Sequence, residues 1–135
     1  MANPAKATRQ SFGEALARLG AENQNIVVLD ADLSKSTKSD LFAKKFPERF
    51  FEMGIQEANM IGVAAGMASC GLRPIAYTIT PFITTRCLEQ IRVDLCYHEL
   101  PAVIVGVGGE LNPVCHVPAA CARSCARCGC GTRPR

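Results

Sequence analysis

The chain has 135 residues, of which 48% are hydrophobic, 20% charged and 6% aromatic, which is enough for one soluble domain with a core of ordinary size. All 12 acidic residues lie at or before Glu110, so residues 1–113 hold 11 basic residues against 12 acidic ones. A body this close to neutral lacks the basic footprint of a nucleic-acid-binding protein, and no apolar run is long enough to span a bilayer. We therefore expect neither a nucleic-acid nor a membrane partner.

The N-terminal lead, residues 1–8, has no apolar core of the secretory type, so we expect a cytoplasmic protein. In the segment that follows, Phe12, Leu16 and Leu19 recur at helical spacing, and the pattern ends at Gly20. This segment is predicted to be a helix that covers one face of a sheet.

A strand is predicted over Asn25–Asp30, because this run is apolar and rich in β-branched residues, as in a parallel strand buried on both faces. In open α/β sheets ligands bind beyond the carboxyl ends of the strands, which makes the polar loop after this strand a candidate site. A solvated turn whose side chains cap helices is an equally good interpretation. The polar side chains of the loop are Asp30, Asp32, Ser34, Ser36 and Thr37.

A short helix over Asp40–Phe46 and a strand over Arg49–Met53 lead into a predicted helix that has Glu57 in its first turn and is closed by Gly71. The helix is rich in glycine and alanine, which allow other backbone to approach it on nearly every face. Glu57 has two interpretations. One is a favourable charge on the helix dipole, worth about 0.3–1 kcal/mol. The other is a partly desolvated carboxylate that is tuned for proton transfer in a cleft.

The remaining apolar runs predict a strand over Pro74–Ile79, a helix over Ile83–Tyr97 and a last strand over Pro101–Val107, apolar throughout. Helices that follow strands at this spacing indicate βαβ units with right-handed crossovers. The predicted fold class is therefore α/β, with a parallel sheet and helices on both of its faces.

Residues 110–135 form a tail that is rich in cysteine and arginine. Cys115–Cys130 contains five cysteines and His116, which are zinc-ligand types, but it offers no second ligand pair on a separate loop. The other interpretation is a disordered tail of accidental sequence, for which a shifted reading frame in GC-rich DNA is a source. We favour the second interpretation and expect that the tail binds no metal ion. The other cysteines are expected to be small core residues of helices: Cys70, Cys87 and Cys96.

Four motifs follow one another along the chain: Val28–Ser34, Phe46–Phe51, Gly54–Ala68 and Thr80–Arg92. Through these motifs residues 9–109 resemble the pyrimidine-binding domain of thiamine-diphosphate enzymes, specifically of transketolases of the split, two-subunit type, in which it opens the C-terminal subunit. The resemblance implies a thiamine-diphosphate-binding pyrimidine domain that is incomplete at its C-terminus. Deoxyxylulose-phosphate synthases and pyruvate dehydrogenase β subunits share the motif around Glu57 and stay open as relatives.

The resemblance assigns roles to individual residues. In this family the glutamate at the position of Glu57 hydrogen-bonds N1′ of the aminopyrimidine and so activates thiamine diphosphate for proton loss at C2. Phe82 matches an aromatic residue that stacks on the pyrimidine ring, and Asp32 matches an acidic residue near the thiazolium. Arg9 and Ser36 match positions that hold the phosphate of a sugar-phosphate substrate, where a guanidinium fork and a hydroxyl suit phosphate oxygens.

Arg86 lies one helical turn after Phe82 in the predicted helix. This spacing lets it reach the same cleft, and it equally allows an exposed ion pair with Glu89. The sequence leaves both partners open.

The implied function is the transfer of a two-carbon ketol unit between sugar phosphates, together with a partner subunit. The Gly-Asp-Gly…Asn signature for Mg²⁺ and diphosphate is not in this chain, and we expect it on a diphosphate-binding transketolase subunit. A Gly-Pro-Thr-His-His type segment expected after Gly109 is also missing. The alternative is therefore an inactive truncated or frameshifted remnant, or a non-catalytic pairing subunit.

Overall fold

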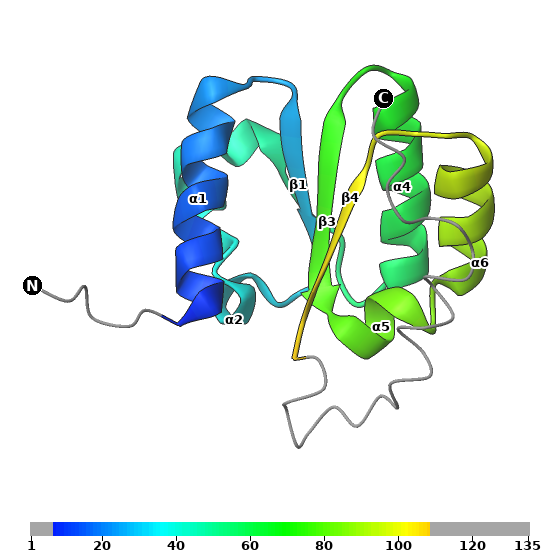
Figure 1. Cartoon of the computed structure of the whole chain (residues 1–135). Helices are drawn as coiled ribbons and strands as arrows, with labels where there is room; N and C mark the ends of the chain where they lie inside the picture. The colour runs from blue at the N-terminus through cyan, green and yellow to red at the C-terminus, as the bar shows by residue number, and fades with distance from the viewer. Residues whose placement is uncertain (1–6, 109–135) are drawn as a thin grey trace, which may run out of the picture.

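The computed structural model describes residues 7–108, which form a sheet with helices on both sides (Figure 1). Four strands lie in the order β2-β1-β3-β4, and every neighbouring pair is parallel, which confirms the predicted fold class. Over these residues no helix is long and apolar enough to cross a bilayer. The elements are α1 (Thr8–Glu22), β1 (Ile26–Asp30), α2 (Ser34–Thr37), α3 (Asp40–Lys45), a 3₁₀ turn (Pro47–Arg49), β2 (Phe50–Glu52), α4 (Glu57–Ser69), β3 (Arg73–Ile79), α5 (Thr80–Thr84), α6 (Leu88–Gln90), a π-helical segment (Ile91–Tyr97) and β4 (Val103–Val107).

The core is divided by β1, all five residues of which are buried. Because successive side chains of a strand point to opposite faces, Val28 and Leu29 belong to different clusters. Val28 packs with Leu16 of α1 and Phe42 of α3, whereas Leu29 packs with Ile61 of α4. The continuous apolar run of this strand is thus explained by a helix layer on each face, as Figure 1 shows.

Helix α4 packs on the sheet with one face only. Met60 and Ala64 are fully buried, whereas Gly62 and Gly66 are exposed. A Cβ atom added at Gly66 would meet nothing within 4 Å. Within residues 7–108 the glycine positions of this helix therefore remain uncovered, and approach by other backbone there stays a prediction.

The single helix predicted over Ile83–Tyr97 is interrupted. Two backbone carbonyls of α5 accept hydrogen bonds from side chains. The Thr84 hydroxyl donates to the Thr80 carbonyl at 2.7 Å, and the Cys87 thiol donates to the Phe82 carbonyl at 3.2 Å. Side-chain bonds of this kind compete with the helical ladder and bend or end a helix. The chain therefore leaves helical geometry before α6 and continues with wider π-helical turns.

The cysteines differ from the prediction at one position. Cys87 is fully buried between α5 and α6, and Cys96 is partly buried in the π-helical segment. Cys70 is exposed just after α4, so its assignment to the core was wrong. The cluster Cys115–Cys130, with its alternatives of a zinc site or an accidental tail, lies outside the described residues.

Two glycine substitutions test the packing of the helix layers. A Cβ atom at Gly13 of α1 would lie 2.4 Å from the backbone carbonyl oxygen of Lys38, so we expect Gly13→Ala to lower the free energy of unfolding by about 1–3 kcal/mol. Gly66→Ala is the matched control in α4, where the space is open, and should raise it by up to about 1 kcal/mol. Urea unfolding followed by circular dichroism measures both. Equal effects would contradict this packing of α1 against the loop.

Candidate functional site

The carboxyl ends of the parallel strands meet at one end of the sheet, the lower end in Figure 1. There Asp30 of β1 stands in register with Glu52 of β2 and Tyr77 of β3. Helices α2 and α5 lie at the same end, and α4 begins there with Glu57. This is the edge at which open α/β sheets bind ligands, and the predicted site residues are distributed along it.

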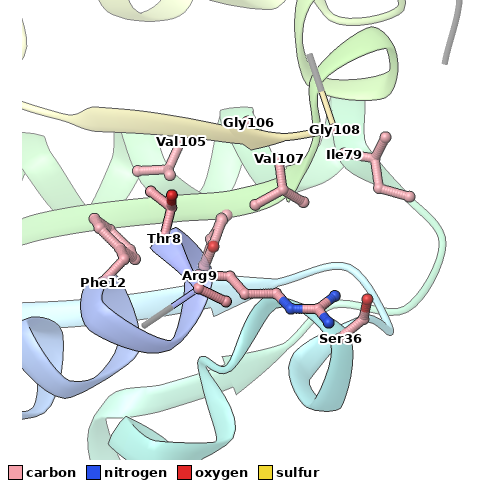
Figure 2. Close-up of a pocket in the computed structure, with 11 residues that line it drawn as sticks. Thr8, Arg9, Phe12, Ser36, Ile79, Val105, Gly106, Val107 and Gly108 are labelled. Carbon is pink, nitrogen blue, oxygen red and sulfur yellow. The ribbon is translucent and has the colours of Figure 1, made fainter. Parts of the chain in front are cut away.

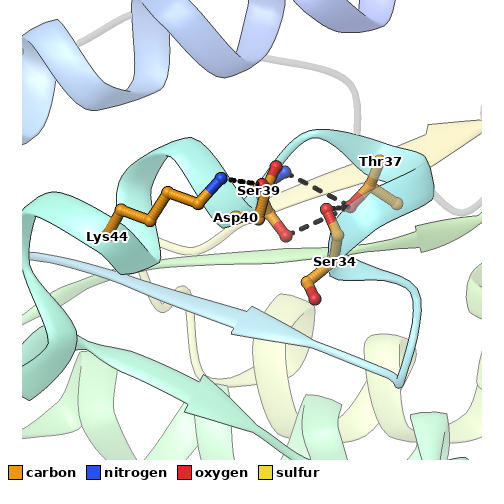
Figure 3. Close-up of polar contacts among 5 residues, drawn as sticks. All are labelled: Ser34, Thr37, Ser39, Asp40 and Lys44. Atoms are coloured by element: carbon orange, nitrogen blue, oxygen red, sulfur yellow. Dashed lines mark hydrogen bonds and ion pairs between the residues drawn. The ribbon is translucent and has the colours of Figure 1, made fainter.

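Asp30 organises the polar loop that follows β1. Its buried carboxylate accepts hydrogen bonds at Oδ2 from the hydroxyls of Thr37 (2.9 Å) and Ser39 (2.7 Å). Its Oδ1 accepts a hydrogen bond from the backbone N–H of Leu33 at 2.7 Å. Figure 3 shows the contact between Thr37 and Ser39 within this loop. Asp30, Thr37 and Ser39 thus hold the loop in shape. All three are fully buried, and neither α2 nor α3 has a side-chain cap, so the loop is not the solvated, helix-capping turn of the alternative interpretation.

A cavity of about 690 Å³ opens between the start of α1 and the ends of β3 and β4. Arg9 and Ser36 both line it, and Figure 2 shows the Arg9 side chain extending toward Ser36. The structure thus brings together the two residues predicted to hold a phosphate. The rest of the wall is mainly apolar or backbone: Ala7, Thr8, Phe12, Tyr77, Ile79, Val105, Gly106, Val107 and Gly108.

Tyr77 belongs to the cavity wall but was not among the predicted site residues. Its ring meets Phe12 edge to face, with 5.1 Å between the centroids. Burial raises the pKa of its hydroxyl, the Asp30 carboxylate raises it further, and Arg9 lowers it. The hydroxyl therefore keeps its proton near neutral pH. The sequence feature that could have marked Tyr77 as a site residue is its position near the carboxyl end of a predicted strand.

Glu57 begins α4 and is 2% exposed. Its Oε2 accepts a hydrogen bond from Nη1 of Arg86 at 2.9 Å, and the Arg86 side chain is itself 50% exposed. The same guanidinium lies over the ring of Phe82, with Cζ 4.5 Å from the ring centroid. Arg86 therefore links the predicted catalytic residue to the predicted stacking residue.

The alternative partner of Arg86 is excluded by this geometry. Glu89 instead accepts hydrogen bonds from Arg92, at 2.9–3.3 Å. The sequence allowed both arrangements, because Glu57 lies 29 residues before Arg86 and only the packing of α4 beside α5 brings them together. Arg86 therefore pairs with Glu57 beside Phe82 and not with Glu89.

The pKa of the Cys87 thiol depends on the charges of Glu57 and Arg86. Burial is the largest cause that raises the pKa of its thiol to about 11; the Glu57 carboxylate raises it further, and Arg86 lowers it. The thiol is therefore neutral at physiological pH. It serves as a hydrogen-bond donor to the Phe82 carbonyl rather than as a nucleophile.

Asp32 lies apart from these groups. It is exposed, has a positive φ of 58°, and its backbone N–H donates to the Glu52 carboxylate. Aspartate is one of the residues that adopt this left-handed conformation more readily than others. Asp32 does not line the cavity, and its place near a thiazolium stays a prediction.

A family model described as the transketolase pyrimidine-binding domain matches residues 4–112, which is most of the chain. The chain belongs to the transketolase pyrimidine-binding domain family. This membership confirms the family predicted from the four motifs. The predicted domain limits, residues 9–109, stay a prediction.

Relatives of this transketolase-family chain are much longer than it is. A "Putative transketolase C-terminal section" of Methanocaldococcus jannaschii is 48% identical over 100 residues, which cover 74% of this chain and 32% of the relative. A 1-deoxy-D-xylulose-5-phosphate synthase of Clostridium beijerinckii is 38% identical over 118 residues, which cover 82% of this chain and 19% of that enzyme. The transketolase-family chain thus spans about a third or less of the length of these relatives.

Solved structures agree with the fold. A split-gene transketolase in an inactive β4 tetramer matches with a TM-score of 0.69 at 54% identity, covering 76% of this chain and 34% of that chain. The transketolase of Campylobacter jejuni matches with a TM-score of 0.66 at 25% identity, covering 74% of this chain and 16% of that chain. Both place the described sheet within the transketolase pyrimidine domain.

The pKa of Cys87 tests the charge arrangement at Glu57. We expect Glu57→Gln to lower this pKa, because a nearby negative charge is lost, and Arg86→Met to raise it, because a positive charge is lost. The Cβ chemical shift of ¹³C-labelled cysteine, followed through an alkaline titration, gives both values, with exposed Cys70 as internal reference. A change of the same sign in both variants would contradict the arrangement.

The same raised pKa has a consequence for stability. The folded chain keeps the Cys87 proton above the ordinary pKa of 9.0, whereas the unfolded chain releases it there. The contribution of this thiol to stability is therefore complete below about pH 9 and is lost as the pH rises toward 11. Cys87→Ala is expected to flatten the fall in unfolding free energy over that range, measured by urea unfolding at each pH.

Proposed function

We propose that this chain supplies the pyrimidine-binding half of a thiamine-diphosphate site that transfers a two-carbon ketol unit between sugar phosphates. The observation that supports the proposal is the buried carboxylate of Glu57 in the first turn of α4. Arg86 hydrogen-bonds this carboxylate and also lies over the ring of Phe82. Family members of this kind use thiamine diphosphate, and Glu57 and Phe82 are the residues that the resemblance assigns to its pyrimidine.

The residues present fit a pyrimidine ring. An aminopyrimidine needs a hydrogen-bonding partner at a ring nitrogen and a flat apolar surface against its face. Glu57 offers a carboxylate that is almost completely removed from water, and Phe82 offers an aromatic face that already carries a flat group. These two side chains would hold the pyrimidine, and the cofactor would supply a carbanion-forming C2 atom when bound.

Glu57 acts in this proposal through a proton at its carboxyl group. A carboxyl that shares a proton with a ring nitrogen benefits from a dry setting, because the hydrogen bond is stronger where water does not compete. The 2% exposure of Glu57 provides that setting. In the chain without cofactor, Arg86 balances the negative charge of Glu57, since a buried carboxylate without a cation is unfavourable.

Arg9 and Ser36 would hold the phosphate of the sugar substrate. They line one cavity of about 690 Å³, to which Arg9 contributes a cationic guanidinium, and the described wall around it is largely apolar. An apolar wall excludes water around the phosphate and strengthens its attraction to Arg9. The cavity has room for a phosphorylated sugar beside the sheet.

A partner subunit would complete the site. Residues 7–108 contain no group of three or more His, Cys, Asp or Glu side chains that could hold a metal ion. We therefore assign Mg²⁺ and the diphosphate group to a diphosphate-binding transketolase subunit. The solved split-gene relative, an inactive tetramer of one kind of subunit, supports a need for a second chain.

A second candidate activity is that of a 1-deoxy-D-xylulose-5-phosphate synthase. A relative with this name is 38% identical over 118 residues, so the pyrimidine half of the site is compatible with either enzyme. Assays of the assembled subunits with sugar-phosphate donors, and separately with the substrates of that synthase, distinguish the two activities.

Replacing Glu57 tests its role in cofactor activation. In the full chain assembled with a diphosphate-binding transketolase subunit, we expect Glu57→Gln to slow deuterium exchange at C2 of thiamine diphosphate by at least about 10²-fold. Cofactor affinity, measured by calorimetry, should change far less, because glutamine keeps the volume and most of the hydrogen bonding. Glu89→Gln, at an exposed ion pair, is the control and should exchange at the wild-type rate. Wild-type exchange in Glu57→Gln would remove this residue from the mechanism.

Replacing Arg9 tests the phosphate assignment. We expect Arg9→Met to lower kcat/KM for a phosphorylated acceptor sugar by roughly tenfold or more, since a charge-assisted hydrogen bond is lost. The value for the same sugar without phosphate should be unchanged. Arg18→Met, an exposed arginine of the same helix, serves as control. Equal losses for both sugars would show that Arg9 does not read the phosphate.

A further inference from the structure

Arg86 makes two contacts at the place where the proposed function puts the pyrimidine ring. Its Nη1 donates to Oε2 of Glu57 at 2.9 Å, and its Cζ lies 4.5 Å from the centroid of the Phe82 ring. Glu57 is 2% exposed and Arg86 is 50% exposed, so the guanidinium covers a buried carboxylate from the solvent side. The planar guanidinium of Arg86 therefore contacts both the Glu57 carboxylate and the face of the Phe82 ring.

A guanidinium and an aminopyrimidine present similar chemistry to these two residues. Both are flat and delocalised, both carry N–H donors along an edge, and both stack on an aromatic ring. A carboxylate at the edge and a phenyl ring at the face satisfy either group. Because Glu57 and Phe82 offer one such place, the two groups compete for it.

We propose that Arg86 is an internal occupant of the pyrimidine site, and that the cofactor ring enters only when the guanidinium leaves Glu57 and Phe82. This inference rests on the proposed function, since it takes those two residues as the pyrimidine contacts. While Arg86 is in place, the buried carboxylate of Glu57 is paired with a cation, which keeps the site stable without cofactor. The same contact lowers the apparent affinity for the ring.

The position of Arg86 in the chain allows it to leave. It lies in the interruption between α5, which ends at Thr84, and α6, which begins at Leu88. Its side chain is half exposed, so a rotation toward solvent breaks no helical hydrogen-bond ladder. Only the arginine of this pair is half exposed, so the guanidinium can move into water, while Glu57 is left to the incoming ring as its new hydrogen-bond partner. The apparent affinity for a ring is reduced by the fraction of time that the site is open.

The experiment uses the full chain and the pyrimidine half of thiamine, 4-amino-5-hydroxymethyl-2-methylpyrimidine, as the probe. Its Kd is measured by NMR titration. Arg86→Met removes the flat N–H-bearing group, and we expect it to bind the probe roughly fivefold or more tightly than the wild type. Arg92→Met removes an exposed arginine that is paired with Glu89, and it should match the wild type. Arg86→Lys keeps the charge beside Glu57 but not the flat group, and its affinity should fall between the two.

A second measurement follows the arginine itself. The Nε–H resonance of Arg86 should be restricted in the chain without probe and should become as mobile as that of Arg92 when the probe is added. If the wild type binds the probe and Arg86→Met binds it no more tightly, the inference is overturned and the proposed function stands. If neither the wild type nor Arg86→Met binds the probe, the proposed function fails and the inference falls with it.

Discussion

The buried carboxylate of Asp30 is the constraint on which the functional end of the sheet depends. A carboxylate removed from water needs donors, and the loop after β1 supplies three of them. The loop is thereby held against α1, where the Lys38 carbonyl approaches Gly13 closely. Ser36 lies in this loop and Arg9 lies in the first turn of α1. The phosphate-binding arrangement proposed for these two residues thus follows from hydrogen bonds that neither of them makes.

The second constraint is that helices cover both faces of one parallel sheet. The cavity with Arg9 and Ser36 belongs to the face that α1 covers, whereas Glu57 begins α4 on the other face. Parallel strands end together, so both groups reach the same end of the sheet without a long loop. In the function that we propose, the substrate phosphate would be held on one side and the cofactor ring on the other, and the two would meet beyond the strand ends.

Several features of the site were predictable from local patterns. The position of Glu57 in the first turn of a helix follows from the run of small and apolar residues behind it. The structure adds that its carboxylate is buried, and its role in proton transfer stays a prediction. Strand β1 was readable because a central parallel strand must be apolar on both faces. The break after α5 was missed because the side-chain bonds of Thr84 and Cys87 to backbone carbonyls have no signature in apolar spacing. Tyr77 was missed because an aromatic residue in a buried strand is assigned to the core by default. Only the contacts of the folded chain show that it lines the cavity.

By itself the sequence determined the alternation of strands with helical segments, the parallel α/β class and the family, because hydrophobic spacing and ordered motifs are local properties of the chain. Only the tertiary structure decided which charges meet. Arg86 had a nearby carboxylate in Glu89 and a distant one in Glu57, and the distant one is its partner. The reason is geometric: the interruption after α5 turns Arg86 toward the start of α4, while Arg92 lies beside Glu89. Contacts between residues far apart in sequence depend on how the elements pack, and the spacing of residues along the chain does not predict that packing.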